Sequence, residues 1–129
     1  MTIEDFKRFI NHELNLSTRW ETVADGQYLI IENYKLPAGP YEGSLVSIAI
    51  KNTNTVPFCP HPSVHVSPHL ASFKRITKNV NGRNVTARNV LKSKIGVEWQ
   101  YWSRRFINQP ATPQDLWTQL LYTFIEDIN

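Results

Sequence analysis

The sequence predicts an α+β fold built on an antiparallel β-sheet. Three observations lead to this class: an amphipathic helical pattern at the start of the chain, a second one near its end, and short β-type runs separated by turn residues between them. The chain has 129 residues, of which 41% are hydrophobic and 19% are charged. This length and composition are typical of one globular domain, which we expect to span residues 1–129.

A first helix is predicted over residues 3–15. Thr2 and Asp5 have the spacing of a capping box, with Asp in place of the usual Glu. Apolar residues then recur at intervals of three and four and form one helical face: Ile3, Phe6, Ile10 and Leu14. We expect this face to pack on the sheet.

A four-stranded antiparallel meander is expected to follow. Three of its strands are predicted at residues 28–36, 45–50 and 63–67, where β-type residues are bounded by proline and glycine. In the second of these runs, alternate residues are apolar enough to form a buried face.

Two stretches show no regular pattern. Residues 17–25 are interpreted as a polar connector, and residues 72–98 as an irregular segment. Within the latter, Asn81 and Gly82 are typical turn residues.

The C-terminal helix is predicted over residues 113–127. Thr112, Pro113 and Asp115 supply a capping residue, a first-turn proline and an acid in the order expected at a helix start. A wide apolar stripe follows: Leu116, Trp117, Leu120, Leu121, Phe124, Ile125 and Ile128. We expect this helix to cover a second accessible region of the sheet.

The net charge of +3 is unevenly distributed. Between Glu42 and Glu98 there is no acid, whereas eight bases occur there: Lys51, Lys74, Arg75, Lys78, Arg83, Arg88, Lys92 and Lys94. Such a basic strip is typical of a surface that attracts an acidic protein or a nucleic-acid backbone, although solvated loop residues give the same pattern.

Cysteine and histidine give no strong catalytic or metal-binding motif. Cys59, His61, His65 and His69 have residue types that suit zinc. Residues four apart on an extended strand lie about 13 Å apart, however, so no metal site is predicted and the histidines are expected on the solvent side of a strand. Cys59 is interpreted as a structural, partly buried thiol, and as the chain's single cysteine it excludes an internal disulfide.

Other functional classes leave no clear signature. The sequence has no glycine-rich phosphate loop and no nucleophile elbow, and no cofactor is predicted. No apolar run approaches the roughly 18 residues of a membrane span, and the acidic, amphipathic start does not resemble a signal peptide, so we expect a cytoplasmic protein. Trp99 and Trp102, with Arg104 and Arg105 nearby, suit either a core anchor or base stacking in a nucleic-acid-binding module.

Two motifs carry a family resemblance. The turn Pro40-Tyr41-Glu42-Gly43 precedes an alternating strand, and the segment Pro57-Phe58-x-Pro60-x-Pro62-x-Val64 leads into the next strand. In this order and spacing they resemble ubiquitin-conjugating enzymes, in which a PYEGG turn and a YPFxPPxV segment occupy these places. The tail GVEWQYWSRRF, followed by a proline and an apolar helix, is most similar to the prokaryotic branch of that family.

The expected catalytic motif of that family is altered in this chain. The family has an HPN motif, then a glycine, then the catalytic cysteine. Asn79 and Gly82 stand closest to the asparagine and the glycine, and the cysteine is then expected near Asn84 or Val85, neither of which is a thiol. The histidine and proline of HPN and the last two helices of the full family are also absent.

The resemblance therefore implies a non-catalytic, ubiquitin-conjugating-like protein of a bacterial conjugation pathway. It would bind a ubiquitin-like protein or the pathway's conjugating or activating enzyme, through Lys74, Arg75, Lys78 and Arg83. One alternative is an active enzyme that carries the modifier on Cys59, or on a hydroxyl such as that of Thr86, with Asn79 in support. A second alternative is a small nucleic-acid-binding module.

Overall fold

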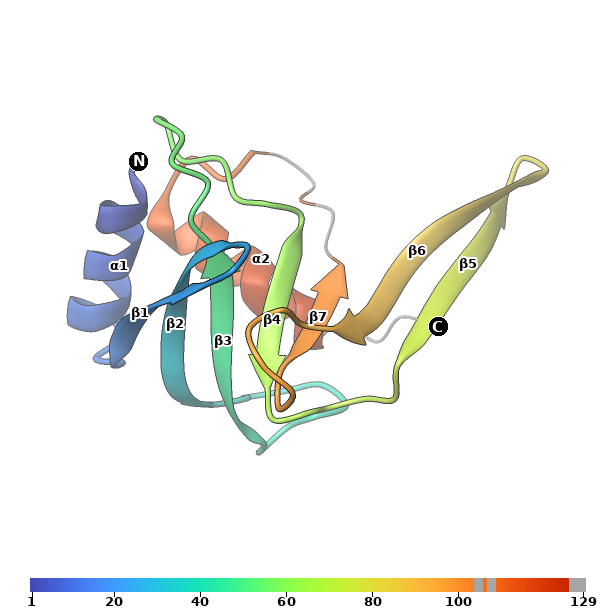
Figure 1. Cartoon of the computed structure of the whole chain (residues 1–129), viewed down its shortest axis with the longest axis horizontal. Helices are drawn as coiled ribbons and strands as arrows, with labels where there is room; N and C mark the ends of the chain where they lie inside the picture. Colours follow the sequence, from blue (N-terminus) through green and yellow to red (C-terminus); the bar gives the residue numbers. More distant parts are fainter. Residues whose placement is uncertain (104–105, 107–108, 126–129) are drawn as a thin grey trace.

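The computed structural model describes residues 1–103, 106 and 109–125, and at 75–80 and 83–88 it describes the backbone without the side chains. Within these residues it contains two helices and seven strands (Figure 1). The elements are α1 (Ile3–His12), β1 (Thr18–Val23), β2 (Gly26–Lys35), β3 (Leu45–Lys51), β4 (Ser63–Ser67), β5 (Lys74–Val80), β6 (Arg83–Lys92), β7 (Gln100–Ser103) and α2 (Pro113–Ile125). The α+β class is confirmed.

The strands form one antiparallel sheet in the order β1-β2-β3-β4-β7-β6-β5. The prediction of a four-stranded sheet is therefore wrong. The first four strands are neighbours in chain order, but β7 then pairs with β4, and the β5–β6 hairpin extends the sheet beyond β7. The expected strands at 28–36, 45–50 and 63–67 correspond to β2, β3 and β4.

The first missed strand is β1, which lies in the segment interpreted as a connector. It pairs with β2 from Thr18 opposite Ile31 to Val23 opposite Gly26. Because β1 is an edge strand, it needs few apolar residues, and its composition therefore resembles that of a loop.

The irregular segment is instead a long hairpin of β5 and β6. Val80 pairs with Arg83, which leaves Asn81 and Gly82 as a two-residue turn with φ angles of 53° and 79°. Positive φ at both positions is the geometry that Asn-Gly turns favour, so the turn prediction is confirmed. The strands were missed because much of the hairpin projects away from the helices (Figure 1) and does not need the apolar alternation of a buried strand.

The helix starts were predicted well. Thr2 and Asp5 form the reciprocal capping box, and the Thr112 hydroxyl accepts a hydrogen bond from the amide of Asp115. α1 ends at His12 and not at residue 15, because Asn15 adopts a left-handed φ of 54°. The described part of α2 ends at Ile125, so residues 126–127 of the predicted helix lie outside the described residues.

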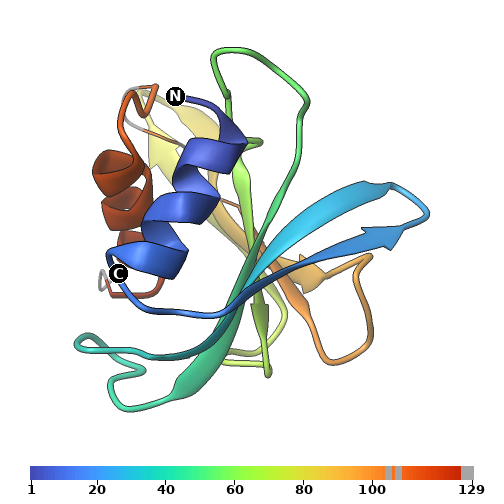
Figure 2. The same ribbon diagram turned by 90° about the vertical axis from the view of Figure 1, so that its left-hand side faces the viewer.

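Both helices cover the same face of the sheet (Figure 2). The second region that α2 was expected to cover therefore lies on the same face as α1, and α2 does not cover the opposite face of the sheet. Apolar residues of the two helices and of alternate strand positions make one core, which includes Phe6, Ile10, Leu29, Ile48, Val66, Trp102, Leu120 and Phe124. The rings of Trp102 and Phe124 have centroids 5.0 Å apart, so β7 contacts α2 at the centre of this core.

We expect Leu120→Ala and Phe124→Ala each to lower the free energy of unfolding by roughly 2–5 kcal/mol, because both side chains are fully buried. Chemical denaturation measures this loss. Thr118→Ala, on the exposed side of the same helix, is the control and should change stability by less than about 0.5 kcal/mol. Silent core variants would mean that α2 does not contribute to the core.

Candidate functional site

The face of the sheet opposite the helices carries a row of residues contributed by five strands. Ile30 lies opposite Ala49, Ala49 opposite His65, His65 opposite Tyr101, and Tyr101 opposite Leu91. Because side chains alternate between faces along a strand, this row points away from the helical core. It places a histidine and a tyrosine at the centre of the open face.

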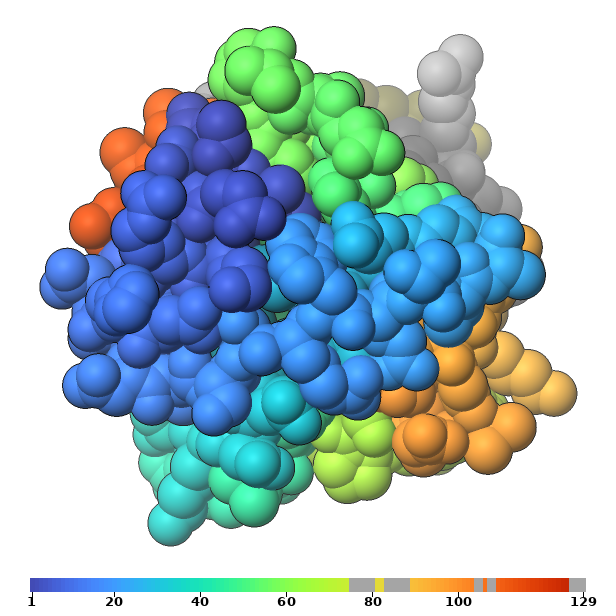
Figure 3. Space-filling model, turned by 60° about the vertical axis from the view of Figure 1, so that its left-hand side comes forward, coloured from blue at the N-terminus to red at the C-terminus, as the bar shows by residue number. Residues whose placement is uncertain are grey.

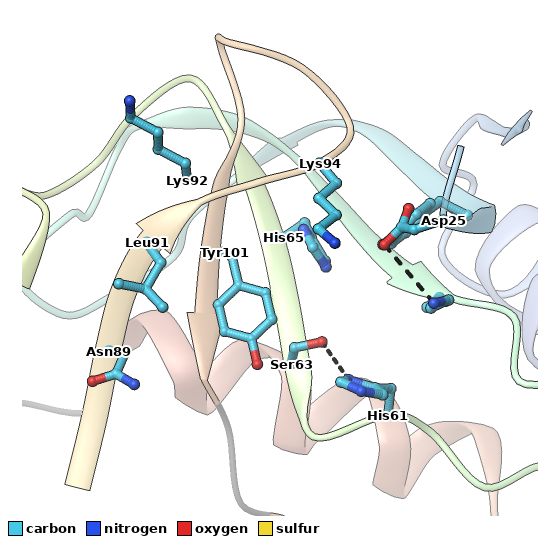
Figure 4. A pocket seen from close by; sticks show the side chains of 11 residues that line it. Asp25, His61, Ser63, His65, Asn89, Leu91, Lys92, Lys94 and Tyr101 are labelled. Atoms are coloured by element: carbon cyan, nitrogen blue, oxygen red, sulfur yellow. Dashed lines mark hydrogen bonds and ion pairs between the residues drawn. The ribbon is translucent and has the colours of Figure 1, made fainter. Parts of the chain in front are cut away.

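A cavity of about 380 Å³ lies on this open face. One side is lined by Asp25, Tyr28 and Lys51 from the region of β1–β3. The other residues come from the end of the loop before β4, from β4, β6 and β7, and from the loop after β6. Those used below are His61, Ser63, His65, Asn89, Lys94 and Tyr101 (Figure 4). The cavity is therefore assembled from segments that lie far apart in the sequence.

His65 is a buried, hydrogen-bonded histidine at the base of this cavity, with 3% of its surface exposed. Its Nδ1 lies 2.8 Å from the hydroxyl oxygen of Ser93. Its ring meets those of Tyr28 and Tyr101 edge to face, at centroid distances of 4.9 and 5.4 Å. Burial lowers the pKa of His65 to about 4, so its ring is neutral at pH 7.

On the opposite side of the cavity, Asp25 contacts both Lys51 and the phenol of Tyr28. The Tyr28 hydroxyl donates a hydrogen bond of 2.9 Å to Oδ2 of Asp25, and the Lys51 ammonium lies 3.8 Å from the same oxygen. Burial, followed by the contact with Asp25, raises the pKa of Tyr28, so its phenol stays protonated. Oδ1 of Asp25 is buried and has no hydrogen-bond partner within the part of the chain that the structure describes.

The loop between β6 and β7 closes one end of the cavity. Ile95 from this loop and Val23 from β1 pack against a small apolar cluster of the open face that includes Tyr28 and Trp99. Figure 3 shows this loop beside the β1–β2 hairpin at the surface. The loop positions Lys94, whose side chain points toward the side where His65 and Asp25 lie (Figure 4).

Lys94 has no carboxylate within ion-pair distance among the described residues, and the same holds for Lys92. Lys92 also lines the cavity, but its ammonium group points away from His65 and Tyr101 (Figure 4). Lys94 therefore supplies an uncompensated positive charge on the cavity side.

Cys59 is exposed and lies in the loop between β3 and β4, so its interpretation as a partly buried thiol is wrong. Its thiol donates to Oε1 of Gln109 at 3.3 Å, and its amide donates to the Thr55 hydroxyl. No base or acid contacts the thiol within the described residues. This segment forms a loop because its three prolines, Pro57, Pro60 and Pro62, prevent a continuous strand.

The structure does not bring Cys59 and the histidines together. His61 bonds to the Ser63 hydroxyl, and His69 contacts the Val97 carbonyl. No group of three or more His, Cys, Asp or Glu residues suited to a metal ion occurs in the described part of the chain. The expectation that all three histidines face solvent is wrong for His65, because β7 and the β6–β7 loop cover it.

The residues singled out for catalysis or partner binding lie mainly on the β5–β6 hairpin. Lys74 is exposed at the start of β5. The side chains of Arg75, Lys78, Asn79, Arg83 and Thr86 lie outside the described residues, but their backbones are in the hairpin, where Asn79 is opposite Asn84. The hairpin projects far from the Cys59 loop, so the two segments are not combined in one site (Figure 1).

The two tryptophans considered for base stacking are core residues. Trp99 is 5% exposed and Trp102 is 2% exposed. Neither ring is available to stack on a nucleotide base, and Arg104 and Arg105 lie outside the described residues. The core-anchor interpretation is confirmed for both tryptophans.

Sequence reasoning missed the cavity itself. The run 63–67 was predicted to be a strand, but no local pattern linked its Ser63 or His65 to Asp25, Tyr101 or Lys94. The link depends on β7 pairing with β4, which is a contact between segments about 35 residues apart. A β-type reading of residues 100–103 was the signal that could have suggested this pairing.

These features define an α+β protein whose antiparallel sheet has a helical layer on one face and a polar cavity on the other. A family model described as "Prokaryotic E2 family E" matches residues 5–127. The chain therefore belongs to this prokaryotic E2-like family, which supports a role in a ubiquitin-like conjugation pathway. No curated protein and no solved structure matches the chain.

The described helices include none that is long and apolar enough to cross a membrane. α1 has ten residues and α2 has thirteen over its described length. A bilayer-spanning helix needs about 20.

We expect stability to fall as the pH is lowered from about 6.5, the ordinary pKa of histidine, through the folded value of about 4 for His65. The unfolded state binds a proton that the folded state excludes, so the loss should reach roughly 2 kcal/mol by pH 5. Above pH 7 no such loss is expected. Chemical denaturation at several pH values, compared between the wild type and His65→Gln, isolates the contribution of this residue. Parallel profiles for the two proteins between pH 7 and 5 would contradict the assignment.

Proposed function

We propose that this chain is a non-catalytic, ubiquitin-conjugating-like protein that acts by binding. Its partner is a ubiquitin-like modifier or the conjugating or activating enzyme of the same pathway. Family membership supports the pathway, and the arrangement of the candidate nucleophiles supports the binding role.

The observation that carries this proposal is the absence of a thiol from residues 79–85, the segment in which the family resemblance places the nucleophile. Residues 79–85 belong to a paired hairpin, with Asn79 opposite Asn84 and Lys78 opposite Val85. The chain's single cysteine lies in a different loop, at residue 59. A thioester carrier needs a thiol activated by a base or a positive field, and within the described residues the Cys59 thiol contacts a neutral amide instead.

One observation favours a second candidate function, which is a conjugating enzyme with a displaced nucleophile. Cys59 is exposed, and a large modifier can therefore reach its thiol. In this alternative the modifier is carried on Cys59 or on the hydroxyl of Thr86, with Asn79 in support. A single biochemical experiment distinguishes a covalent adduct with the modifier from non-covalent binding of a partner.

We expect no thiol-cleavable adduct on this chain when it is incubated with ATP, the pathway's activating enzyme and its modifier. Non-reducing and reducing gels detect such an adduct. Cys59→Ser should give the same result as the wild type and should leave conjugation by the complete pathway unchanged. An adduct that disappears in Cys59→Ser would establish the displaced-nucleophile alternative, and an adduct that resists reducing agent would point to a hydroxyl.

The binding surface that we propose for a partner protein includes Lys74, Arg75, Lys78 and Arg83. All four lie on the β5–β6 hairpin, which projects from the end of the sheet. The stretch between Glu42 and Glu98 contains no acid, so an approaching acidic surface meets no repulsive carboxylate from this stretch. Charges at such a surface mainly accelerate association and make it dependent on salt.

We expect the double variant Arg75→Glu, Lys78→Glu to slow association with the partner several-fold at low salt, because rim charges steer encounter. Surface plasmon resonance with immobilised modifier, activating enzyme or conjugating enzyme measures the rate. Lys7→Glu, Arg8→Glu makes the same charge change on α1 and should leave the rate unchanged.

An unchanged rate for the hairpin variant with every pathway protein would contradict the proposed surface. Loss of binding to arbitrary DNA or RNA, with no effect on any protein, would favour the nucleic-acid-binding module instead. Phosphate-backbone binding would also weaken steeply as salt increases. Circular dichroism confirms that both double variants remain folded.

A further inference from the structure

The cavity on the open face of the sheet has the size of a small ligand site. Its volume of about 380 Å³ lies at the lower end of the roughly 300–1,000 Å³ that ligand pockets occupy. The two helices lie on the opposite face, so neither of them fills or covers it. We propose that this cavity binds the C-terminal end of a peptide, with the terminal carboxylate at Lys94.

Lys94 supplies the charge for this contact. It lines the cavity, and its side chain points toward the side occupied by His65 and Asp25 (Figure 4). It has no carboxylate partner among the described residues, whereas Lys51 is already paired with Asp25 at 3.8 Å. A carboxylate that entered the cavity would form a charge-assisted hydrogen bond with the ammonium group of Lys94.

The lining groups favour a carboxylate over a phosphate. Phosphate sites typically use arginine forks, helix N-termini or consecutive backbone amides. The described lining contains no arginine, and α1 and α2 begin on the other side of the sheet. Of the three lining lysines, Lys51 is paired with Asp25, and the Lys92 ammonium group points away from His65 and Tyr101 (Figure 4). The one ammonium group that remains, that of Lys94, matches the charge of one carboxylate.

The remaining lining groups match the backbone of a peptide. Ser63, His61 and Asn89 bring polar groups to the same cavity, where Ser63 and His61 are hydrogen-bonded to each other, and the ring of Tyr101 gives it an apolar surface. Oδ1 of Asn89 is buried without a hydrogen-bond partner in the described residues, so a small rotation toward an incoming N–H group would satisfy it. The volume suits about two or three small residues.

This inference deepens the proposed function and rests on it for the source of the peptide. In a protein that binds a ubiquitin-like modifier, the ligand would be the end of the modifier's C-terminal tail. The cavity and the basic hairpin would then hold two parts of the same partner. The chemistry of the cavity, however, is tested without any pathway protein.

The experiment is an NMR titration of the ¹⁵N-labelled chain with triglycine as the free acid and as the C-terminal amide. We expect the free acid to shift the amide signals of Ser63 and Tyr101 in a saturable manner. The affinity for the amide should be lower by a factor of about ten or more, because the amide lacks the charge that pairs with Lys94. Equal affinity for the two forms, equal affinity for inorganic phosphate, or no binding at millimolar concentrations would overturn the inference.

Two lysine variants test the placement of the carboxylate. Lys94→Met should weaken free-acid binding about tenfold or more, whereas Lys92→Met removes the same charge from a side chain that points away and should change binding less than about twofold. Both residues are exposed, and the ¹⁵N spectra verify that each variant is folded. Similar effects of the two variants would indicate general electrostatic attraction and would contradict the placement of the carboxylate at Lys94.

The outcomes also separate this inference from the proposed function. If the tripeptide does not bind but the modifier associates normally, the cavity site is contradicted and the proposed binding role is not. If a cysteine-linked adduct forms and the tripeptide binds normally, the proposed non-catalytic role is contradicted and the cavity site is not.

Discussion

The structure depends on one constraint, which is the packing of both helices against the same face of the sheet. Alternate residues such as Leu29, Ile48 and Val66 point into the helical layer, and their neighbours must point to the other side. Because no described helix covers that other side, polar and aromatic residues can gather there around His65. The core and the cavity are thus two consequences of the same strand alternation.

The position of β7 connects the two halves of the sheet. By pairing with β4 on one side and β6 on the other, β7 places Trp102 in the core and Tyr101 beside His65. The loop that precedes it supplies the Ser93 hydroxyl to His65 and the Lys94 side chain to the cavity. A disturbance of β7 should therefore affect stability and ligand binding together, whereas a change in the projecting hairpin should affect partner association alone.

Local patterns in the sequence were sufficient for both helix starts, for strands β2 to β4 and for the Asn81–Gly82 turn. Each of these has a capping residue, an apolar alternation or a turn signal of its own. The same reasoning failed for β1 and for β5–β6, because strands at an edge or outside the core layer do not need buried apolar residues. It also failed for the cavity, since His65 and Tyr101 are brought together by a pairing that no local pattern encodes.

The polar cavity on the open face of the sheet is the basis for the central proposal of this account, which is that the partner binds on the side opposite the helices. Amide hydrogen exchange of the chain, alone and with its modifier bound, tests this most directly. We expect slower exchange in β6, in β7 and in the loop between them, with no change in α1 or α2. Protection confined to the two helices would contradict the claim.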